Sequence, residues 1–401
     1  MNENKLSILS GSLLWLGAAI SIAEILTGTL LAPLGFGWGL LAIIAGHLIG
    51  GILFYFVGLI GAKSRVSAMG SVRFSFGRYG SVFFSVLNVL QLVGWTAVMI
   101  ISGAKALGSV AEGHSAIFNN LFWCVVIGVL IVLWILAGLK NLNKLNNIAV
   151  LALFALCLVL GFLVFKGGSS AGITGTMTFG MALELAVAMP ISWLPMISDY
   201  TQNADKPVGF TAASTVCYFA GSCFMYVIGL GAAIFAGSPD VVMILKGAGL
   251  GAAAIIIVIL ATVTTTFLDV YSAGQSILNI CPGLNEKLVG IAICILGTVI
   301  AIFTPIERYQ DFLYLIGSVF VPMAAILLTD YFILGKRDTN KKIDILNTLL
   351  WVAGFVLYRL FLKIDTVMGS TVPVVALVVL FSLCIKAVGA YRIKFKAKRQ
   401  L

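Results

Sequence analysis

Three oxygen-bearing groups in one apolar segment have the spacing of a small cation site. Ala261, Thr264 and Thr265 stand at positions i, i+3 and i+4, so a main-chain carbonyl and two hydroxyls share one helical face. Hard oxygen ligands of this kind suit a small, desolvated cation, and sodium is the natural candidate. The alternative is that these threonines donate to carbonyls of their own helix, a common habit in membranes. Spacing alone leaves the two interpretations even.

Carboxylates within apolar segments form a second group of candidates, because an ionisable side chain is costly in lipid and is functional there by default. Glu24 lies in the first apolar segment, and Asp269 follows Thr265 by one helical turn. Both carboxylates could therefore face one cavity. Two further ionisable groups, His47 and Lys105, are interpreted as structural, with a transport role as the alternative.

Three more carboxylates lie toward the ends of apolar segments. Glu184 is near the predicted outer start of the sixth segment, where we expect it to reach solvent. Asp199 and Asp330 each precede a tyrosine at the predicted inner end of a segment. A gate or an interfacial salt bridge is expected at these two Asp-Tyr pairs.

One pair of side chains indicates a planar ligand. Gln91 and Trp95 are four residues apart, so an amide and an indole ring can point to the same side of a helix. The ring offers a flat stacking surface, and the amide offers both donors and an acceptor. A planar heterocycle needs that combination.

The elements that must position these groups are transmembrane helices. Of the 401 residues, 61% are hydrophobic and only 10% are charged, and the mean hydropathy is +1.11. A soluble globule cannot bury that much apolar surface, whereas about 20 apolar residues suffice to cross a bilayer. We expect one all-α integral membrane domain over 1–401, with no cleaved signal peptide. Twelve transmembrane helices are predicted, at 8–31, 37–61, 81–107, 118–138, 146–165, 178–199, 208–236, 248–277, 286–303, 311–333, 345–362 and 371–390.

Basic residues set the expected orientation in the membrane. With the amino terminus inside, 19 of the 25 lysines and arginines fall on inner segments, so both termini are predicted to be cytoplasmic. The net charge of +10 therefore reflects the orientation of the chain in the membrane. Because the basic residues are scattered over many loops, no nucleic-acid partner is expected. The expected location is the cytoplasmic (inner) membrane of a bacterium.

Two of the twelve segments contain helix breakers at membrane depth. The first has Ser21 and Glu24 before a Thr-Gly-Thr run, and the sixth has Pro190, Ser192 and Pro195. Proline removes a main-chain donor, and unpaired main-chain groups in a membrane are tolerated only where they line a cavity. Segments one and six correspond if the fold repeats after five segments, which predicts a binding site at two broken helices. Ordinary kinks are the alternative.

Taken in their order along the chain, these residues carry a family resemblance. The segment count, Gly94-Trp95, the run 73–77 in the loop after the second segment, Asp199-Tyr200 and Thr264-Thr265 resemble the nucleobase:cation symporter-1 (NCS1) family over essentially the whole chain. Within the family, the chain resembles the cytosine permease branch. Residues 17–28 are most similar to the bacterial hydroxymethylpyrimidine transporters called CytX.

The resemblance implies a LeuT-type 5+5 inverted repeat plus two extra helices. The first repeat would occupy about 8–165, the second about 178–333, and the extra helices about 345–390. It also implies a sodium site of three carbonyls and two hydroxyls, which fall on Gly17, Ile20, Ala261, Thr264 and Thr265. No cofactor is implied beyond this coupling ion, and a proton is the alternative ion.

The family's substrate residues fall partly on different side chains here. Its stacking tryptophan falls on Trp95, but its second aromatic falls on Pro190, so the second ring is either absent or supplied by Trp193. A family asparagine falls on Thr266, and Glu24 replaces a neutral residue of the cytosine permeases. The predicted substrate site comprises Glu24, Gln91, Trp95, Pro190, Ser192, Trp193, Thr266 and Asp269.

These patterns predict a secondary active transporter that imports a pyrimidine by cation symport. Hydroxymethylpyrimidine is the first candidate substrate and sodium the expected ion; a permease for cytosine or another nucleobase, with proton coupling, is the alternative. A channel would need a continuous polar pore or charged rings. A membrane enzyme would need a cluster of acids, bases or metal ligands, and the chain has only two histidines. We expect the protein to be a monomer in the lipid bilayer with a small pyrimidine as its partner. We do not expect it to be an enzyme.

Overall fold

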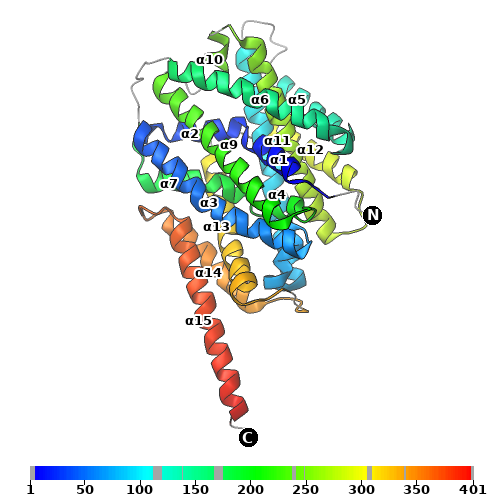
Figure 1. Ribbon diagram of the computed structural model, residues 1–401, viewed down its shortest axis with the longest axis vertical. Helices are drawn as coiled ribbons and strands as arrows, with labels where there is room; N and C mark the ends of the chain where they lie inside the picture. Colours follow the sequence, from blue (N-terminus) through cyan, green and yellow to red (C-terminus); the bar gives the residue numbers. More distant parts are fainter. Residues whose placement is uncertain are drawn as a thin grey trace.

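Helices account for nearly all regular structure in this protein (Figure 1). The structure is a computed structural model that describes residues 5–111, 120–137, 139–166, 175–236, 241–247, 249–304, 309–337 and 340–398. Within these ranges, the only strand-like pairing is an isolated bridge between Leu6 and Ala204. This is the expected result for apolar segments, because in lipid a helix pairs its main-chain groups within itself.

The helices match the predicted segments closely. Among the described residues, seven are long and apolar enough to cross a membrane, α1 and α2 form an eighth span bent by 51°, and four shorter apolar helices complete the predicted twelve. In chain order the elements are α1 (Ile8–Ala19), α2 (Ile22–Leu30), the 3-10 turn η1 (Ala32–Leu34), α3 (Phe36–Ser64), α4 (Ala68–Ala111), α5 (Asn120–Ala137), α6 (Leu139–Lys166), α7 (Phe179–Ser192), α8 (Ile197–Thr201), α9 (Pro207–Phe235), α10 (Val241–Gly247), α11 (Gly251–Ile280), α12 (Glu286–Phe303), α13 (Tyr309–Leu328), the π-helical turn η3 (Thr329–Ile333), α14 (Ile345–Phe361) and α15 (Thr371–Lys398).

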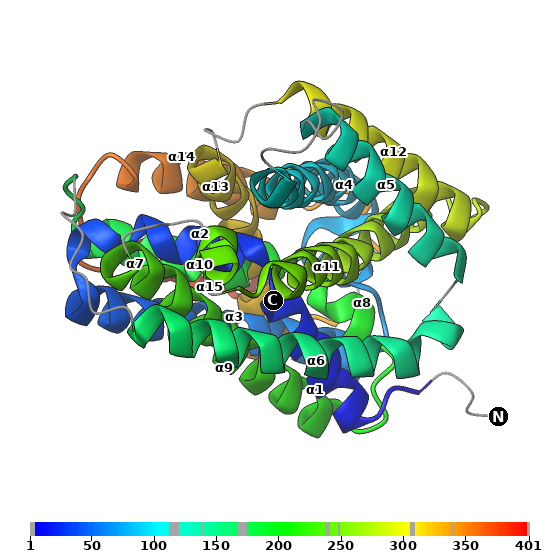
Figure 2. The ribbon, with the colours of Figure 1, turned by 90° about the horizontal axis from the view of Figure 1, so that it is seen from above.

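Two groups of helices make up most of the molecule. One contains α1, α2, α3, α7 and α9, and the other contains α4, α5, α11 and α12. Figure 2 shows α4, α5 and α12 on one side and α3, α7 and α9 on the other, with α11 between them. Helices α14 and α15 pack on α13, and Figure 1 shows α15 running away from the other helices toward the carboxyl terminus.

Within the first group, the main chains of α2 and α9 touch. A Cβ atom on Gly28 would overlap the carbonyl of Tyr226, and one on Gly229 would overlap the carbonyl of Ile25. Only glycine leaves room for this approach, which gives membrane helices extensive van der Waals contact. The two helices therefore pack as one unit.

The run 73–77 belongs to α4 and not to a loop, so that prediction was wrong. The helix changes direction at Gly77, whose φ of 77° suits glycine alone. Directly after the turn, the N–H of Arg78 donates to the carbonyl of Lys341 (3.2 Å). Gly77 thus separates two helical stretches of α4, and the residue that follows it pairs with a distant segment.

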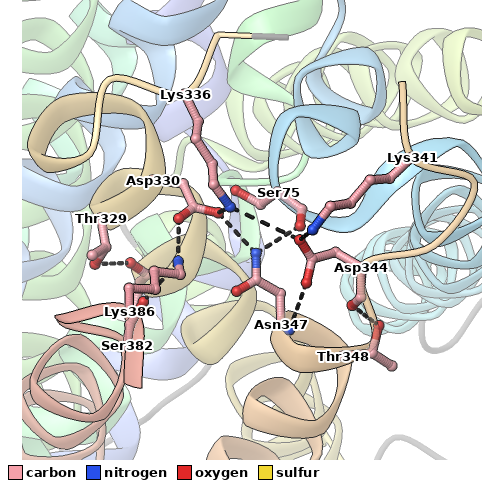
Figure 3. Close-up of polar contacts among 11 residues, drawn as sticks. Ser75, Thr329, Asp330, Lys336, Lys341, Asp344, Asn347, Thr348, Ser382 and Lys386 are labelled. Atoms are coloured by element: carbon pink, nitrogen blue, oxygen red, sulfur yellow. Dashed lines mark hydrogen bonds and ion pairs between the residues drawn. The ribbon is translucent and has the colours of Figure 1, made fainter. Parts of the chain in front are cut away.

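Asp330 is a buried carboxylate at the predicted inner end of the tenth segment, with three donors around it (Figure 3). Its oxygens accept from the side chains of Lys336 (3.4 Å), Asn347 (2.8 Å) and Lys386. Asn347 also donates to the carbonyl of Ser75 in α4 (2.6 Å). The carboxylate therefore joins η3 to α14 and α15, as a salt-bridged contact and not as an isolated charge.

Glu184 is buried, with 2% of its surface exposed, so the expectation that it reaches solvent was wrong. Its carboxylate accepts from the N–H groups of Ser370 (2.6 Å) and Thr371 (2.8 Å), and from the hydroxyls of Thr371 (2.7 Å) and Tyr358. The N–H groups at the start of a helix lack partners within it and favour a negative charge. Glu184 of α7 thus caps the start of α15.

Candidate functional site

A cavity lies where the two helix groups meet, beside the breaks in two spans. It has room for one water molecule (about 10 Å³), so a heterocycle can enter only if the walls move apart. The walls come from α1 and α2, from α4, from α7 and the break after it, and from α11. The lining residues are Ala18, Ser21, Ala23, Glu24, Trp95, Met99, Met189, Ser192, Trp193, Met196, Thr265 and Asp269.

The first break separates α1 from α2 at Ile20 and Ser21. The hydroxyl of Ser21 accepts from the N–H of Glu24 (3.3 Å), and this contact begins α2. The N–H of Ile20 turns back to the carbonyl of Gly17 (3.2 Å), whereas the carbonyl of Ile20 accepts no hydrogen bond from the described residues. Such a carbonyl at membrane depth is available to a cation.

The second break, at 193–196 between α7 and α8, is supported by side chains of α4. Gln91 donates to the carbonyl of Ser192 (3.1 Å), and Asn88 donates to the carbonyl of Pro195 (3.0 Å). The two amides are also joined to each other, from Gln91 to Asn88 (2.9 Å). Gln91 therefore pairs the freed main chain, and it does not line the cavity.

Two indole rings from different helix groups face the cavity. Trp95 of α4 is buried, and its ring N–H has no acceptor among the described residues. Trp193, at the second break, meets the ring of Trp15 edge-on, with 5.3 Å between centroids. Pro190 lies outside the cavity wall and packs against Gly50 of α3, so Trp193 is the second aromatic in the site.

The threonines of α11 divide between the two interpretations that their spacing left open. Thr264 donates to the carbonyl of Leu260 (2.7 Å), and Thr266, which is not in the cavity wall, donates to the carbonyl of Thr262 (2.6 Å). Thr265 is different, because its buried hydroxyl has no partner among the described residues and lines the cavity. The oxygen lone pairs of Thr265 are free, and the hydroxyl of Thr264 keeps its lone pairs while it donates, so both oxygens fit a small cation.

The two carboxylates of the cavity differ in their hydrogen bonds. Glu24 accepts from the hydroxyls of Tyr218 (3.0 Å) and Ser222 (2.7 Å) of α9. The side chain of Lys105 is exposed and forms no ion pair with Glu24. Asp269 is buried in the wall and accepts no hydrogen bond from the described residues. Asp269 is therefore the carboxylate that remains free for a ligand.

Three residues that shape the site were not singled out from the sequence. Tyr218 and Ser222 stand four residues apart in an apolar segment, and this spacing of two hydroxyls on one helical face was a usable signal. Asn88 precedes Gln91 by three residues, so the pair of amides was also visible. Their partners lie on other segments, and no sequence pattern indicates which ones.

Comparison with known proteins identifies the family. Residues 2–393 match the family described as permease for cytosine/purines, uracil, thiamine, allantoin. The chain belongs to this family. The permease is 26% identical to the cytosine permease of Escherichia coli (strain K12) over 356 residues, which cover 86% of this chain and 83% of that protein.

Solved structures show the same fold. The permease is similar to Mhp1, a nucleobase-cation-symport-1 family transporter, in a closed conformation with bromovinylhydantoin bound (TM-score 0.81, 18% identity, covering 95% of this chain and 93% of that chain). It is also similar to a Na+-coupled sialic acid symporter in a substrate-bound outward-open state (TM-score 0.68, 14% identity, covering 94% and 89%). The predicted NCS1 family and the LeuT-type fold of twelve transmembrane helices are confirmed. The permease is a multi-pass membrane transporter for a nucleobase-type substrate, and not an enzyme.

Proposed function

We propose that the permease imports 4-amino-5-hydroxymethyl-2-methylpyrimidine together with sodium. The observation that carries this proposal is the partner-free carboxylate of Asp269 in a cavity that two indole rings also line. Trp95 and Trp193 can hold a flat ring, because stacking on an aromatic side chain is worth about 1–3 kcal/mol per base. Asp269 can accept from an exocyclic amine, and its charge strengthens that bond.

The choice of an aminopyrimidine with a hydroxymethyl group rests on the polar part of the wall. An amine beside a ring nitrogen matches a carboxyl group that accepts from the amine and shares a proton with the ring, and both Glu24 and Asp269 line the cavity. Ser21 and Ser192 add hydroxyl groups to the same wall, which can pair with a hydroxymethyl substituent. Cytosine has no such substituent.

Sodium coupling rests on the break in the first span and on Thr265. The ion would be held by the carbonyls of Gly17, Ile20 and Ala261 and the hydroxyls of Thr264 and Thr265. The unpaired hydroxyl of Thr265 and the unpaired carbonyl of Ile20 support this donor set, as does the similarity in fold to a Na+-coupled symporter.

The same proposal includes the arrangement of the chain in the membrane. The two repeats run over about 8–165 and 178–333, so that substrate and ion lie at the first, broken helix of each repeat. The permease works as a monomer in a bacterial cytoplasmic membrane. Both termini lie inside, as the distribution of basic residues indicates.

Uptake into proteoliposomes tests the proposal. Labelled hydroxymethylpyrimidine should enter faster with an inward sodium gradient than with a matched potassium gradient, and excess cytosine should not compete well. Asp269→Asn should abolish uptake, whereas Glu286→Gln should not, because Glu286 is exposed and lies outside the cavity. Uptake that does not depend on the sodium gradient, or full activity in Asp269→Asn, would contradict the proposal.

Cytosine is the second candidate, favoured by the similarity to the cytosine permease of Escherichia coli. The same assay separates the two substrates. If unlabelled cytosine competes as well as unlabelled hydroxymethylpyrimidine, the cavity does not use the hydroxymethyl group and cytosine is the better assignment.

A further inference from the structure

A hydrogen-bonded chain leads from the cavity wall into the packing between α2, α3 and α9. Oε2 of Glu24 lies 2.7 Å from Oγ of Ser222, which lies 2.6 Å from Nε2 of His47. Beyond the imidazole, Nδ1 of His47 lies 2.9 Å from the carbonyl oxygen of Ile43. Glu24, Ser222 and His47 are each no more than 1% exposed, so bulk water does not reach these contacts.

The hydrogens along this chain can be counted. A main-chain carbonyl only accepts, so Nδ1 of His47 must carry a hydrogen to pair with Ile43. The two links between Glu24 and His47 then need two hydrogens, and the hydroxyl of Ser222 supplies one. The other is bound either to Oε2 of Glu24 or to Nε2 of His47. The observed geometry therefore requires one proton that the three side chains share.

We propose that Glu24, Ser222 and His47 form a proton-binding site in the cavity wall, and that the permease binds and releases one proton there during transport. With the proton on Glu24 the chain is neutral, and with the proton on His47 it is an ion pair of zero net charge. Without the proton one link is lost, and the carboxylate becomes an uncompensated buried charge, which is strongly unfavourable. The proton can therefore leave only when the cavity opens to water.

The groups that surround this chain do not replace the proton. On α9, the hydroxyl of Tyr218 donates to Oε1 of Glu24 (3.0 Å), and that of Tyr226 donates to the carbonyl of Leu185 (3.1 Å). No lysine or arginine of the described residues pairs with Glu24. The other titratable groups near the chain are Cys223 on α9, Tyr309 on α13 and Asp269 across the cavity, and none of them is a base that is positively charged at neutral pH.

This inference adds a proton to the ions of the proposed function, and it can be tested without any substrate. The chain has only two histidines, His47 and His114, so a ring label of ¹⁵N gives signals that their loss in His47→Gln assigns. In the purified permease at neutral pH, we expect one of two results. Either an infrared band of a protonated carboxyl group disappears in Glu24→Gln, or both ring nitrogens of His47 carry hydrogen. An ionised Glu24 together with a singly protonated His47 would overturn the proposal.

Transport supplies a second test. With equal sodium on both sides, an inward proton gradient (acidic outside) should stimulate uptake of hydroxymethylpyrimidine or cytosine into proteoliposomes. In His47→Gln and Ser222→Ala this stimulation should fall to the level without a gradient, because both residues belong to the chain but neither lines the cavity. Glu286→Gln changes an exposed carboxylate that pairs with Gln275, and it should keep the stimulation. Full stimulation in both His47→Gln and Ser222→Ala would contradict the proton site. Failure of the parent to carry either pyrimidine would contradict the proposed function, and the spectroscopic result would still decide the proton site.

Discussion

Asn88 of α4 donates from its side-chain amide to the carbonyl of Pro195, at the break between α7 and α8, over 3.0 Å. The same amide donates to the hydroxyl of Ser276 in α11 (2.8 Å). One buried side chain therefore joins three spans beside the cavity. Because a freed carbonyl at membrane depth is unfavourable without a donor, Asn88 helps to maintain the break that forms the site.

Replacing this amide tests its role. Asn88→Leu keeps a similar volume and leaves the carbonyl of Pro195 without its donor, which should destabilise the fold by about 1–3 kcal/mol. Thermal unfolding in detergent measures the loss. Asn279→Leu is the matched control, because the amide of Asn279 donates to side-chain hydroxyls of Ser81 and Ser85 and to no main-chain carbonyl. An equal loss in both variants would refute a special role for Asn88.

The sodium site predicts a loss at each of two neighbouring threonines. Thr265→Ala removes a hydroxyl that has no other partner and should strongly reduce sodium stimulation of uptake, whereas Thr265→Ser keeps the hydroxyl and should keep the stimulation. Thr264→Ala should also reduce the stimulation, because the hydroxyl that donates to Leu260 keeps lone pairs for the ion. The double change to alanine should abolish the stimulation. Full sodium-dependent uptake in the double variant would show that the site is wrongly assigned.

Stacking on Trp95 predicts a graded loss of substrate affinity. Trp95→Ala removes the flat surface and should weaken binding about tenfold or more, since stacking is worth about 1–3 kcal/mol. Trp95→Phe keeps a ring and should be milder. Equilibrium binding of labelled substrate measures both. Trp38→Ala serves as the control, because Trp38 is exposed and lies outside the cavity. Equal affinity in Trp95→Ala and the parent would exclude stacking.

The carboxylates predict substrate selection. Uptake of labelled hydroxymethylpyrimidine should resist excess cytosine in the parent, and it should fall sharply in Glu24→Gln, because the neutral amide cannot share a proton with the pyrimidine ring. Competition assays measure the selectivity. A fully active Glu24→Gln variant would indicate that Glu24 takes no part in selecting the substrate.

Asp344 predicts a pH-dependent contribution to stability at the predicted inner surface. It caps α14 by accepting from the N–H of Asn347 (3.2 Å), and it pairs with Lys341 (2.8 Å) and Lys336 (3.8 Å). Burial raises the pKa of Asp344, but the hydrogen bonds and the two lysine charges outweigh burial and hold the pKa below its usual value. A lowered pKa stabilises the fold above the ordinary pKa of aspartate, and that stability is lost as pH falls through the folded-state pKa.

Two substitutions separate the charge of Asp344 from its capping role. Asp344→Asn keeps a good helix cap, so it should cost only about 0.2–1 kcal/mol at neutral pH, the range of exposed ion pairs. Asp344→Ala also removes the cap and should cost about 1 kcal/mol more. The difference between Asp344→Asn and the parent should shrink in acid. The unfolding temperatures of Asp344→Asn and the parent, measured across a range of pH, test this. A difference between them that stays constant with pH would contradict the prediction.

Much of the fold could be predicted from the sequence, because lipid imposes a local requirement. Each span needs a run of apolar residues, and each break at membrane depth needs a visible breaker, such as Ser21 or Pro195. The same reasoning predicted that Glu24 and Asp269 could share a cavity, and both line it. These carboxylates were recognisable because an ionisable group is costly at membrane depth. Trp95 also lines the cavity, but it was indicated by its spacing from Gln91.

Pairing between distant segments could not be predicted in the same way. Gln91 was expected to face a ligand, but its amide pairs with Ser192, 101 residues away. Glu184 was expected to reach solvent, but its partners Tyr358 and Thr371 lie 174 and 187 residues further along the chain. Hydropathy describes a residue and its neighbours in sequence, whereas a hydrogen bond depends on which helix faces which after packing.

The contact of α2 with α9 through Gly28 and Gly229 limits how the transporter can move. Two backbones in direct contact cannot easily slide past each other, so α2 and α9 move as one rigid body. Glu24 of α2 and Ser222 of α9 then keep their distance throughout the transport cycle. Access to the cavity must change along its other walls, where α4 and α11 contact this rigid body through side chains that can reorient.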